Sequence, residues 1–167
     1  MTCFILDTSA LIGGLRPCSL SGKVYTTDNV VSEVKDARST AALEAWFACG
    51  LKVLSVTGEM IKDAKSIASS SGEMFRLSDT DIEVLALALS LKDECKVVLV
   101  TDDQTLQNIC QKVGIEWMGI RRRGISKVSS WMLECEGCGR RYSPSLKDKV
   151  CPVCGHKLKV RRIVRDK

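Results

Sequence analysis

The chain has 167 residues, 45% of them hydrophobic, which suits one domain of ordinary size with a small additional one and excludes a disordered chain. Its formal charge of +5 is unevenly distributed, because residues 1–120 carry a net charge of −5 and residues 121–167 carry +10. A basic excess confined to one end of a chain is typical of proteins that bind a polyanion such as RNA, although a solubilising surface has the same composition.

The N-terminal segment predicts neither export nor membrane insertion. It lacks a cationic start, and Asp7 interrupts its apolar run, so it does not have the pattern of a signal peptide. No apolar run in the sequence approaches the length that crosses a bilayer. We therefore expect a soluble, cytoplasmic protein that has no membrane partner.

Apolar runs and capping residues predict short strands that alternate with helices over residues 1–120. The strands are expected at residues 2–6, 24–26, 51–56, 96–100 and 115–120. The helices are expected directly after residue 7, from residue 28 or 29, from 39 to 50, from 59 to 70, from 78 onward, and from about 103 to 113. This alternation predicts an α/β fold with a parallel sheet and helices on both faces.

Nine cysteines in a chain that is expected to stay inside the cell argue against a disulfide scaffold. Four of them fall inside the expected elements and are interpreted as small buried hydrophobic residues: Cys3, Cys49, Cys95 and Cys110. Cys18 lies in an expected loop and receives no assignment. The other four form a separate pattern near the C-terminus.

Cys135-x-x-Cys138 and Cys151-x-x-Cys154 are two matched pairs, separated by twelve residues. Two such turns can present four thiolates tetrahedrally to one Zn²⁺ ion, and His156 is then redundant as a ligand. A four-thiolate site has no open position, so the zinc is expected to be structural. In so small a segment the metal supplies much of the folding free energy.

The division of the chain follows from these patterns. We expect an α/β domain over residues 1–120, a basic linker over 121–130 and a zinc ribbon with a basic tail over 131–167. Trp131 or Tyr142 could stack on a nucleobase, although packing inside a small fold explains an aromatic residue equally well. The side chains expected to contact RNA phosphates are Arg121, Arg122, Arg123, Arg140, Arg141, Lys157, Lys159, Arg161 and Arg162.

Four acidic residues lie where strands end or where helices are expected to begin: Asp7, Glu33, Asp81 and Asp102. In an open parallel sheet, ligands bind beyond the carboxyl ends of the strands, so these side chains are expected to meet there. Clustered carboxylates repel one another, and their oxygen atoms favour a hard cation such as Mg²⁺ or Mn²⁺. The cluster therefore makes a catalytic metal site plausible.

Each acid also has a simpler interpretation. Ser78-x-x-Asp81 is a capping-box pattern, and Asp102 or Asp103 could be the N-cap of a helix. Glu33 could be ordinary surface charge. Asp7 is harder to explain in this way, because it ends an apolar strand and burial of an isolated carboxylate is costly.

The order of these motifs resembles the PIN-domain nucleases. That family has a strand that ends in D-T-S, here Asp7–Ser9, and then a glutamate early in a helix, here Glu33. A helix-opening L-S-x-x-D follows, here Leu77–Asp81, and then a strand that ends in T-D-D, here Thr101–Asp103. The resemblance covers roughly residues 2–120 and adds the expectation of a PIN-like fold.

The resemblance implies an endoribonuclease that cleaves single-stranded RNA and depends on Mg²⁺ or Mn²⁺. Asp7, Asp81 and Asp102 are then the metal ligands, and Glu33 is a further ligand or the base for the attacking water. Asp79 and Asp103 neighbour these acids and could carry or share their roles, and Thr8 or Thr101 is expected to orient a ligand or to contact phosphate.

A PIN domain followed by a zinc ribbon is similar to one subgroup, the endonucleases that trim the 3′ end of small-subunit ribosomal RNA in archaea and eukaryotes. This similarity implies precursor rRNA within a small-subunit precursor as the substrate, and ribosome-assembly proteins as possible partners. Other functions stay open: a toxin-like RNase that acts on tRNA or mRNA, a non-catalytic RNA-binding assembly factor, or a zinc-ribbon protein that binds a protein partner.

Overall fold

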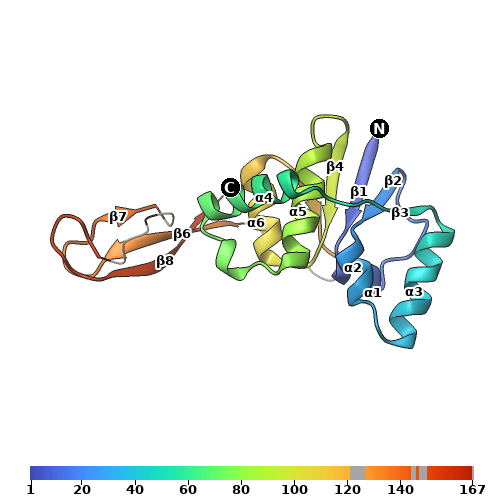
Figure 1. Cartoon of the computed structure of the whole chain (residues 1–167), viewed down its shortest axis with the longest axis horizontal. Coiled ribbons are helices and arrows are strands. Elements are labelled where there is room, and N and C mark those ends of the chain that lie inside the picture. Colours follow the sequence, from blue (N-terminus) through green and yellow to red (C-terminus); the bar gives the residue numbers. More distant parts are fainter. Residues whose placement is uncertain (121–126, 144–145, 147–149, 167) are drawn as a thin grey trace.

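The computed structural model describes residues 1–120, 127–143, 146 and 150–166, which form a larger α/β domain and a small three-stranded sheet (Figure 1). The α/β class that the alternating pattern predicts is confirmed. No helix in the described part of the chain is both long enough and apolar enough to cross a membrane.

Five short parallel strands form the sheet of the larger domain, in the order β3-β2-β1-β4-β5. They are β1 (Thr2–Leu6), β2 (Lys23–Thr26), β3 (Leu51–Val53), β4 (Lys96–Val100) and β5 (Glu116–Met118). The central strand β1 pairs with β4 from Thr2↔Lys96 to Leu6↔Val100. All five strands end on the same side of the sheet, at the lower edge in Figure 1, which we call the carboxyl edge.

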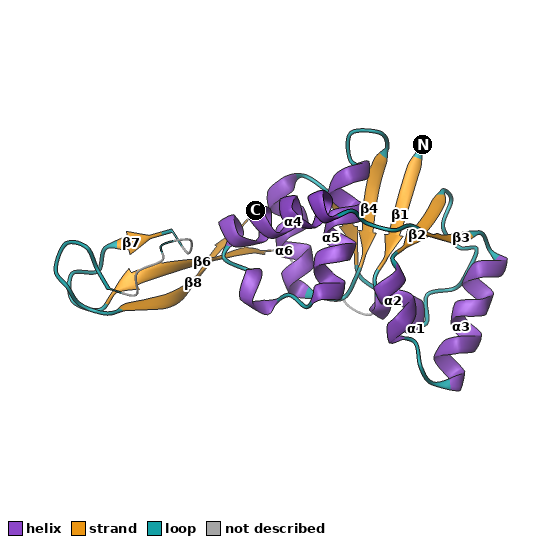
Figure 2. Cartoon of the chain, in the orientation of Figure 1, coloured by secondary structure: helices purple, strands orange, loops and turns teal. Residues whose placement is uncertain are grey.

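Helices flank this sheet (Figure 2). They are α1 (Thr8–Ile12), α2 (Asp28–Glu33), α3 (Ala37–Ala48), α4 (Gly58–Ser71), α5 (Asp79–Leu91) and α6 (Gln104–Val113), with a 3₁₀ turn, η1 (Met74–Arg76), between α4 and α5. Helix α5 packs on β1 and β4, and α4 packs on α5. This layering buries both faces of the central strands, as their nearly continuous apolar sequences require.

The hydrophobic core lies between the sheet and the helices. Ile5 and Leu6 of β1, Leu85 of α5 and Leu99 of β4 are inaccessible to solvent, and Trp46 of α3 is 1% exposed. Burial of a side chain of this size contributes roughly 1.5–3 kcal/mol. The core therefore holds β1 and β4 firmly, and the residues directly after these two strands inherit that rigidity.

Capping residues set the ends of the helices. Gly72, with a φ of 76°, ends α4 in the left-handed conformation that glycine adopts without strain. Asp7 caps α1. Asp36 caps α3, which therefore begins at Ala37 rather than at residue 39, where the sequence predicted its start. Aspartate accepts hydrogen bonds from free helix N–H groups, which is why it serves in both places.

Two disulfide bonds join four cysteines of the larger domain, three of which were expected to be free buried thiols. Cys3 is bonded to Cys95, with their Cα atoms 6.3 Å apart, and Cys18 is bonded to Cys49, with a Cα separation of 5.2 Å. The expectation of isolated buried thiols was therefore wrong for Cys3, Cys49 and Cys95. Cys3 and Cys95 meet because β1 pairs with β4, and the linear sequence does not show this pairing. Cys110 is buried and free, as expected.

The C-terminal part forms an antiparallel sheet in the order β7-β6-β8. Its strands are β6 (Lys127–Cys135), β7 (Arg141–Tyr142) and β8 (Leu158–Asp166). Residues 127–130, which the sequence assigned to the linker, are the first residues of β6 and pair with residues 163–166 of β8. The division of the chain into a domain, a linker and a ribbon otherwise stays a prediction.

Candidate functional site

Asp7 lies at the carboxyl edge and is 7% exposed, directly after the central strand β1. Its Oδ1 accepts a hydrogen bond from the backbone N–H of Thr8 at 2.6 Å. Its Oδ2 accepts hydrogen bonds from the hydroxyls of Ser9, at 3.0 Å, and Thr101, at 2.7 Å. Burial raises the pKa of Asp7, these hydrogen bonds oppose the rise, and the negative charge of Asp81 adds to it.

The same two hydroxyls also accept hydrogen bonds from the chain after β4. The Ser9 hydroxyl accepts from the backbone N–H of Asp102 at 3.1 Å, and the Thr101 hydroxyl accepts from that of Asp103 at 3.0 Å. The D-T-S and T-D-D segments are thereby linked through Asp7. Sequence analysis proposed Thr101 as a possible positioning residue but missed Ser9, although it is the third letter of the D-T-S motif.

Glu33 reaches the site from a different position than expected. It is the last residue of α2 rather than a first-turn residue, because that helix has six residues and begins at Asp28. Its Oε2 accepts a hydrogen bond from the Thr8 hydroxyl, and its negative charge raises the pKa of Asp81. Glu33 therefore belongs to the cluster, held there by the residue after Asp7.

Asp81 is both a capping residue of α5 and a member of the acidic cluster. Its Oδ2 accepts hydrogen bonds from the backbone N–H of Ser78, at 2.8 Å, and from the Ser78 hydroxyl, at 2.7 Å, which completes a capping box at the start of α5. Within the described residues, its Oδ1 accepts none, so one oxygen caps the helix while the other stays available. Partial burial raises the pKa of Asp81 despite the bonds from Ser78, and the charges of Asp103 and Glu33 add to the rise.

Asp102 and Asp103 occupy different environments after β4. The Oδ1 of Asp102 accepts a hydrogen bond from the backbone N–H of Ile120 at 2.7 Å, which ties the end of β4 to the chain after β5. The Oδ1 of Asp103 accepts from the N–H groups of Thr105 and Leu106, at 2.5 and 3.2 Å, and caps α6. Of these two acids, Asp103 is the one whose charge raises the pKa of Asp81.

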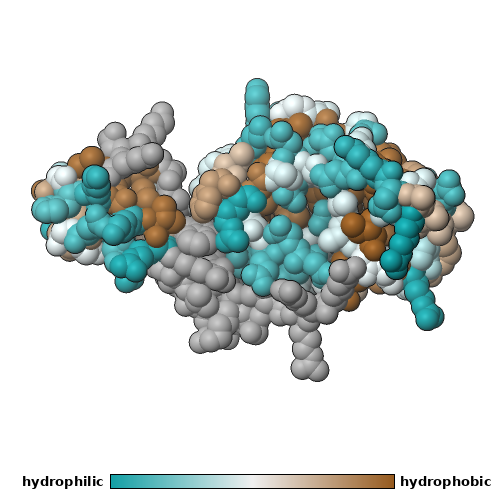
Figure 3. Space-filling view, turned by 90° about the horizontal axis from the view of Figure 1, so that it is seen from below, coloured by the Kyte–Doolittle hydropathy of each residue, from teal (hydrophilic) through white to brown (hydrophobic). Residues whose placement is uncertain are grey.

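The donor set fits a hard divalent cation. Carboxylates from β1, α2, α5 and the β4–α6 turn gather at one edge of the sheet, and two of them have raised pKa values that a cation would relieve. Their ligand atoms are less closely grouped than those of the cysteines discussed next, which are the only metal-ligating group within 4.8 Å of one another in the described residues. Seen from this edge, hydrophilic residues gather across the middle of the domain (Figure 3).

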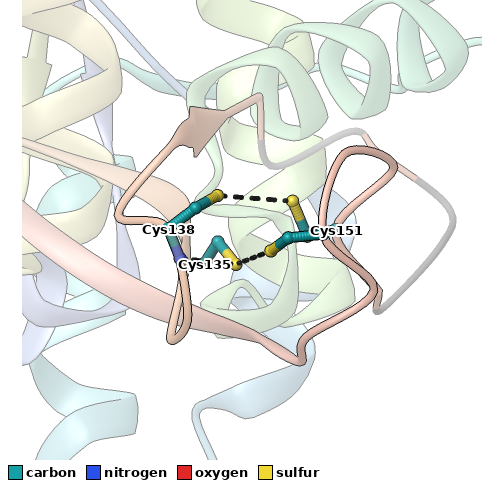
Figure 4. A group of neighbouring side chains, drawn as sticks. Cys135, Cys138 and Cys151 are labelled. Carbon is teal, nitrogen blue, oxygen red and sulfur yellow. Dashed lines mark hydrogen bonds between the residues drawn. The ribbon is translucent and has the colours of Figure 1, made fainter.

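The four predicted cysteine ligands come together in the small sheet (Figure 4). The Sγ atoms of Cys135 and Cys154 are 3.3 Å apart, and those of Cys138 and Cys151 are 3.7 Å apart. A tetrahedral site with Zn–S bonds of about 2.3 Å requires sulfur separations of about 3.8 Å. The group therefore fits a zinc ribbon, and His156 lies outside it.

Surrounding groups favour the thiolate form of Cys135 and Cys151 and lower the pKa of both. A hydrogen bond from the backbone of His156 acts to lower the pKa of Cys154, but its hydrogen bonds with the other three cysteines, together with burial, outweigh that bond and raise the pKa to about 12. The Tyr142 hydroxyl lies 3.0 Å from the Cys151 Sγ, and the backbone N–H groups of Gly137 and Cys138 donate to the Cys135 Sγ at 3.4 and 3.5 Å. Burial acts to raise the pKa of Cys151, but hydrogen bonds led by that of Tyr142 outweigh it and lower the pKa to about 6. Tyr142 thus has a role in the metal site that the sequence analysis did not assign.

The basic residues of the small sheet are partly paired with its own acids. Arg141 and Arg161 both lie next to Glu134, with Nε–O distances of 3.2 and 3.5 Å, and Lys159 pairs with Glu136. Arg140 and Lys157 are also exposed, and the described residues offer neither an ion pair. Three of the expected RNA contacts lie outside the described residues, Arg121, Arg122 and Arg123, and so do the side chains of Arg162 and Trp131.

Comparison with known proteins gives this geometry its context. Residues 4–91 match the family model described as the PIN domain of ribonuclease. The chain is 36% identical to endoribonuclease Nob1 of Archaeoglobus fulgidus, over 98% of this chain and 93% of the relative. It is 38% identical to endoribonuclease Nob1 of Pyrococcus abyssi, over 93% of this chain and 91% of the relative. The chain belongs to the PIN-domain ribonuclease family.

A further relative is ribonuclease VapC1 of Thermoplasma acidophilum, which is 29% identical over 93% of this chain and 76% of its own length. As a PIN-domain ribonuclease, the chain is an endoribonuclease and hence a phosphodiester hydrolase whose substrate is RNA. Nucleases of this family use a divalent metal, which agrees with the carboxylates gathered around Asp7.

We predict that Asp7→Asn removes the response of this PIN domain to divalent cations. Mn²⁺ at about 100 times its dissociation constant adds about 2.7 kcal/mol to the folded state, which should raise the melting temperature of the wild type by roughly 5–10 °C. The variant should show little change in melting temperature with Mn²⁺ and should not cleave RNA. Its amide oxygen can still accept the hydrogen bond from the Thr101 hydroxyl. A full Mn²⁺ shift in Asp7→Asn, measured by calorimetry, would exclude Asp7 as a ligand.

The metal-free protein provides the matching pH test. An acid whose pKa is raised in the folded state binds more protons folded than unfolded, so stability falls as the pH rises through that raised pKa. Lowering the pH should therefore raise the free energy of unfolding of the wild type. The increase should be smaller in Asp7→Asn. Both proteins have the same cysteines, so the difference between their stabilities at each pH does not include the titration of the thiols.

The two roles of Asp81 can be separated by substitutions on either side of the capping box. Ser78→Ala removes the cap and should lower the free energy of unfolding by about 0.5–2 kcal/mol while kcat stays near the wild-type value. Asp81→Asn keeps an oxygen for Ser78 and should keep stability while kcat falls by orders of magnitude. Denaturant unfolding and single-turnover cleavage measure both quantities; the opposite pattern would make Asp81 only a cap.

Removal of the Tyr142 hydroxyl should weaken zinc binding without unfolding the metal-loaded protein. Loss of a hydrogen bond to a metal ligand typically costs about 10–100-fold in metal affinity. Tyr142→Phe should therefore release Zn²⁺ to a competing chelator at a correspondingly lower chelator concentration. Tyr25→Phe, in strand β2, is the matched control and should leave zinc affinity unchanged, and equal affinity in all three proteins would show that the hydroxyl has no influence on the metal.

Proposed function

We propose that this chain is a divalent-metal-dependent endoribonuclease that cleaves single-stranded precursor small-subunit rRNA at its 3′ end during ribosome maturation. The observation that carries the proposal is the buried Asp7 carboxylate, which is surrounded by further acids at the carboxyl edge and tied to both motif strands. The identity of 36–38% to two Nob1 endoribonucleases supports the finer assignment, because these relatives align over 93% or more of this chain. The subgroup that the sequence resembles is the rRNA 3′-end maturation endonuclease, the NIN-one-binding protein.

The acidic residues of the edge divide into two groups in the proposed reaction. Asp7, Asp81 and the acids after β4, Asp102 or Asp103, would hold Mg²⁺ or Mn²⁺. Glu33 would be a further ligand or would accept a proton from the attacking water. The chemistry expected of a bound divalent cation is polarisation of the phosphate and a lower pKa of bound water.

The hydroxyl groups of the D-T-S and T-D-D motifs position the acidic side chains. Ser9 and Thr101 each donate to Asp7 and each accept from the backbone after β4, so the carboxylate oxygens are fixed before a metal or an RNA arrives. Such preorganisation limits the reorganisation needed in the transition state. Thr8 plays the same role for Glu33.

The small C-terminal sheet is proposed to be a zinc ribbon that holds RNA. Residues 1–120 carry a net charge of −5 and repel a polyanion, whereas residues 121–167 carry +10 before zinc binding. Arg140 and Lys157 are exposed beside the cysteine turns, where phosphates can reach them. We further propose ribosome-assembly proteins as partners and the cytoplasm as the location.

A second candidate function is that of a toxin-like ribonuclease acting on tRNA or mRNA. The similarity to ribonuclease VapC1 over 93% of this chain favours it. The lower identity, 29% against 36–38%, is the reason for ranking it second. Both functions use the same acids, so the substrate decides between them.

The experiment is cleavage of an RNA that spans the 3′ end of small-subunit rRNA, beside tRNA and an unrelated single strand of equal length. The full chain loaded with zinc is incubated with Mn²⁺ or Mg²⁺ and, separately, without any added Mg²⁺ or Mn²⁺. We expect one metal-dependent cut near the mature 3′ end and slower cleavage of the other RNAs. Preferred cleavage of tRNA would support the toxin-like function, and metal-independent binding without any cleavage would leave only a non-catalytic assembly factor.

Binding in the same system reports on the ribbon. Affinity of Asp7→Asn for the RNA should fall with salt by about 0.7 logarithmic units per decade for each phosphate contacted on a single strand. Joint substitution of Arg140 and Lys157 by glutamine should make this salt dependence shallower. The change should be that expected for the loss of about one to two phosphate contacts. An unchanged slope would make the ribbon a protein-docking module instead.

A further inference from the structure

The peptide group between Thr101 and Asp102 lies just beyond the hydrogen-bonded part of the larger sheet. The last pairs that β4 makes with its two neighbours are Leu6↔Val100 and Val100↔Met118. Thr101 follows them and is inaccessible to solvent. Its carbonyl therefore needs a hydrogen-bond donor from outside the strands, because a buried carbonyl without a partner is costly.

A buried side chain of α6 supplies this donor. The Nε2 atom of Gln107 donates to the Thr101 carbonyl at 2.7 Å. Gln107 is only 4% exposed, although glutamine is mostly an exposed residue in folded proteins. Its backbone N–H also donates to the carbonyl of Asp103 at 3.0 Å. Gln107 thus holds the turn between β4 and α6 at two points.

A second side chain holds the other end of the same peptide group. The N–H of Asp102 donates to the Ser9 hydroxyl at 3.1 Å. A peptide group is planar, so bonds to its carbonyl and to its N–H together fix its orientation. This orientation sets the direction in which the backbone enters Asp102, while the hydroxyl of the preceding Thr101 donates to Asp7.

The corresponding peptide group before Asp7 depends less on side chains. The Thr26 hydroxyl in β2 donates to the Leu6 carbonyl at 2.9 Å, but the N–H of Asp7 donates to a backbone atom, the carbonyl of Val100, at 3.2 Å. The sheet itself therefore holds part of the end of β1. Because side chains hold both ends of the peptide group after β4, that segment should be the more sensitive to the loss of a single side chain.

We propose that Gln107 is a positioning residue of the nuclease, which fixes the Thr101–Asp102 peptide group so that Asp7 and Asp102 meet a divalent cation in one geometry. This inference rests on the proposed metal-dependent function. Gln107 acts through the backbone of Thr101, and its part is neither to bind the metal nor to contact RNA. Groups that orient metal ligands in this way typically affect metal affinity or activity about 10–100-fold.

The test uses the full chain loaded with zinc and two substitutions of Gln107. Gln107→Met keeps the length of the side chain but removes the donor. Gln107→Asn keeps the amide but is one methylene shorter, and it replaces the methionine variant if that protein does not fold. The matched control is Gln111→Met, the same substitution at a half-buried position one turn further along α6.

Two measurements do not depend on activity. Without added Mg²⁺ or Mn²⁺, the amide hydrogen of Asp102 should exchange roughly tenfold faster in Gln107→Met than in the wild type, relative to the amides of β1. Calorimetric titration should show that the variant binds Mn²⁺ about 10–100-fold more weakly. The control should match the wild type in both measurements.

Cleavage of a single-stranded RNA at a fixed Mn²⁺ concentration gives the third measurement. We expect Gln107→Met to lower kcat by about 10–100-fold and to leave KM nearly unchanged, because the substitution moves metal ligands and leaves the basic C-terminal sheet intact. Ser9→Ala releases the other end of the same peptide group. The double variant should therefore lose less activity than the product of the two single losses, since either loss alone already frees the peptide.

The outcomes separate this inference from the function on which it rests. Faster exchange at Asp102 with unchanged Mn²⁺ affinity and kcat would make Gln107 a purely structural residue and overturn the proposal, and so would unchanged exchange. Equal losses in Gln111→Met, or fully multiplicative losses in the double variant, would also overturn it. If the wild type binds Mn²⁺ but cleaves no RNA, the proposed function fails, and the exchange rates and Mn²⁺ affinities still decide whether Gln107 positions the metal ligands.

Discussion

The carboxylate of Asp7 is the interaction on which the rest of the site depends. It is buried after β1, and burial of a lone charge is costly, so it persists only because three donors from two chain segments satisfy it. Two of these donors, Ser9 and Thr101, also accept from the backbone after β4. The hydrogen bonds that satisfy this one buried charge therefore also position the residues that follow β1 and β4. The core beneath these two strands makes that position rigid.

The remaining acids add repulsion to this frame, although Asp81 and Asp103 also cap helices. Burial raises the pKa values of both Asp7 and Asp81, and repulsion adds to the rise, from Asp81 on Asp7 and from Asp103 and Glu33 on Asp81. A fold that only needed helix caps would gain from spacing these charges apart. In the proposed function, their convergence would lower the stability of the metal-free protein and create affinity for a cation, an exchange of stability for function that is common at active sites.

Much of this architecture could be predicted from the sequence. Alternating apolar runs located the five strands, and the strand-end motifs brought Asp7 and the acids after β4 to one edge, because parallel strands all end on the same side. Local patterns could not show which strands are neighbours, so the Cys3–Cys95 pair was missed. Nor could they separate Asp102 from Asp103, since that difference depends on a hydrogen bond from Ile120, eighteen residues further along the chain.

The separation of charge along the chain explains why the two parts belong together. An acidic edge that binds cations cannot also be a strong electrostatic trap for RNA, because the groups that hold the metal repel the phosphates until the metal is bound. In the proposed function, a basic module on the same chain would remove this conflict, since it would raise the local concentration of RNA without placing cations among the carboxylates. Within that module Glu134 lies between Arg141 and Arg161, so two of its cations are already oriented by a carboxylate of its own. Both parts thus use a carboxylate to position neighbouring groups: Asp7 orders the hydroxyls of Ser9 and Thr101, and Glu134 orders the guanidinium groups of Arg141 and Arg161.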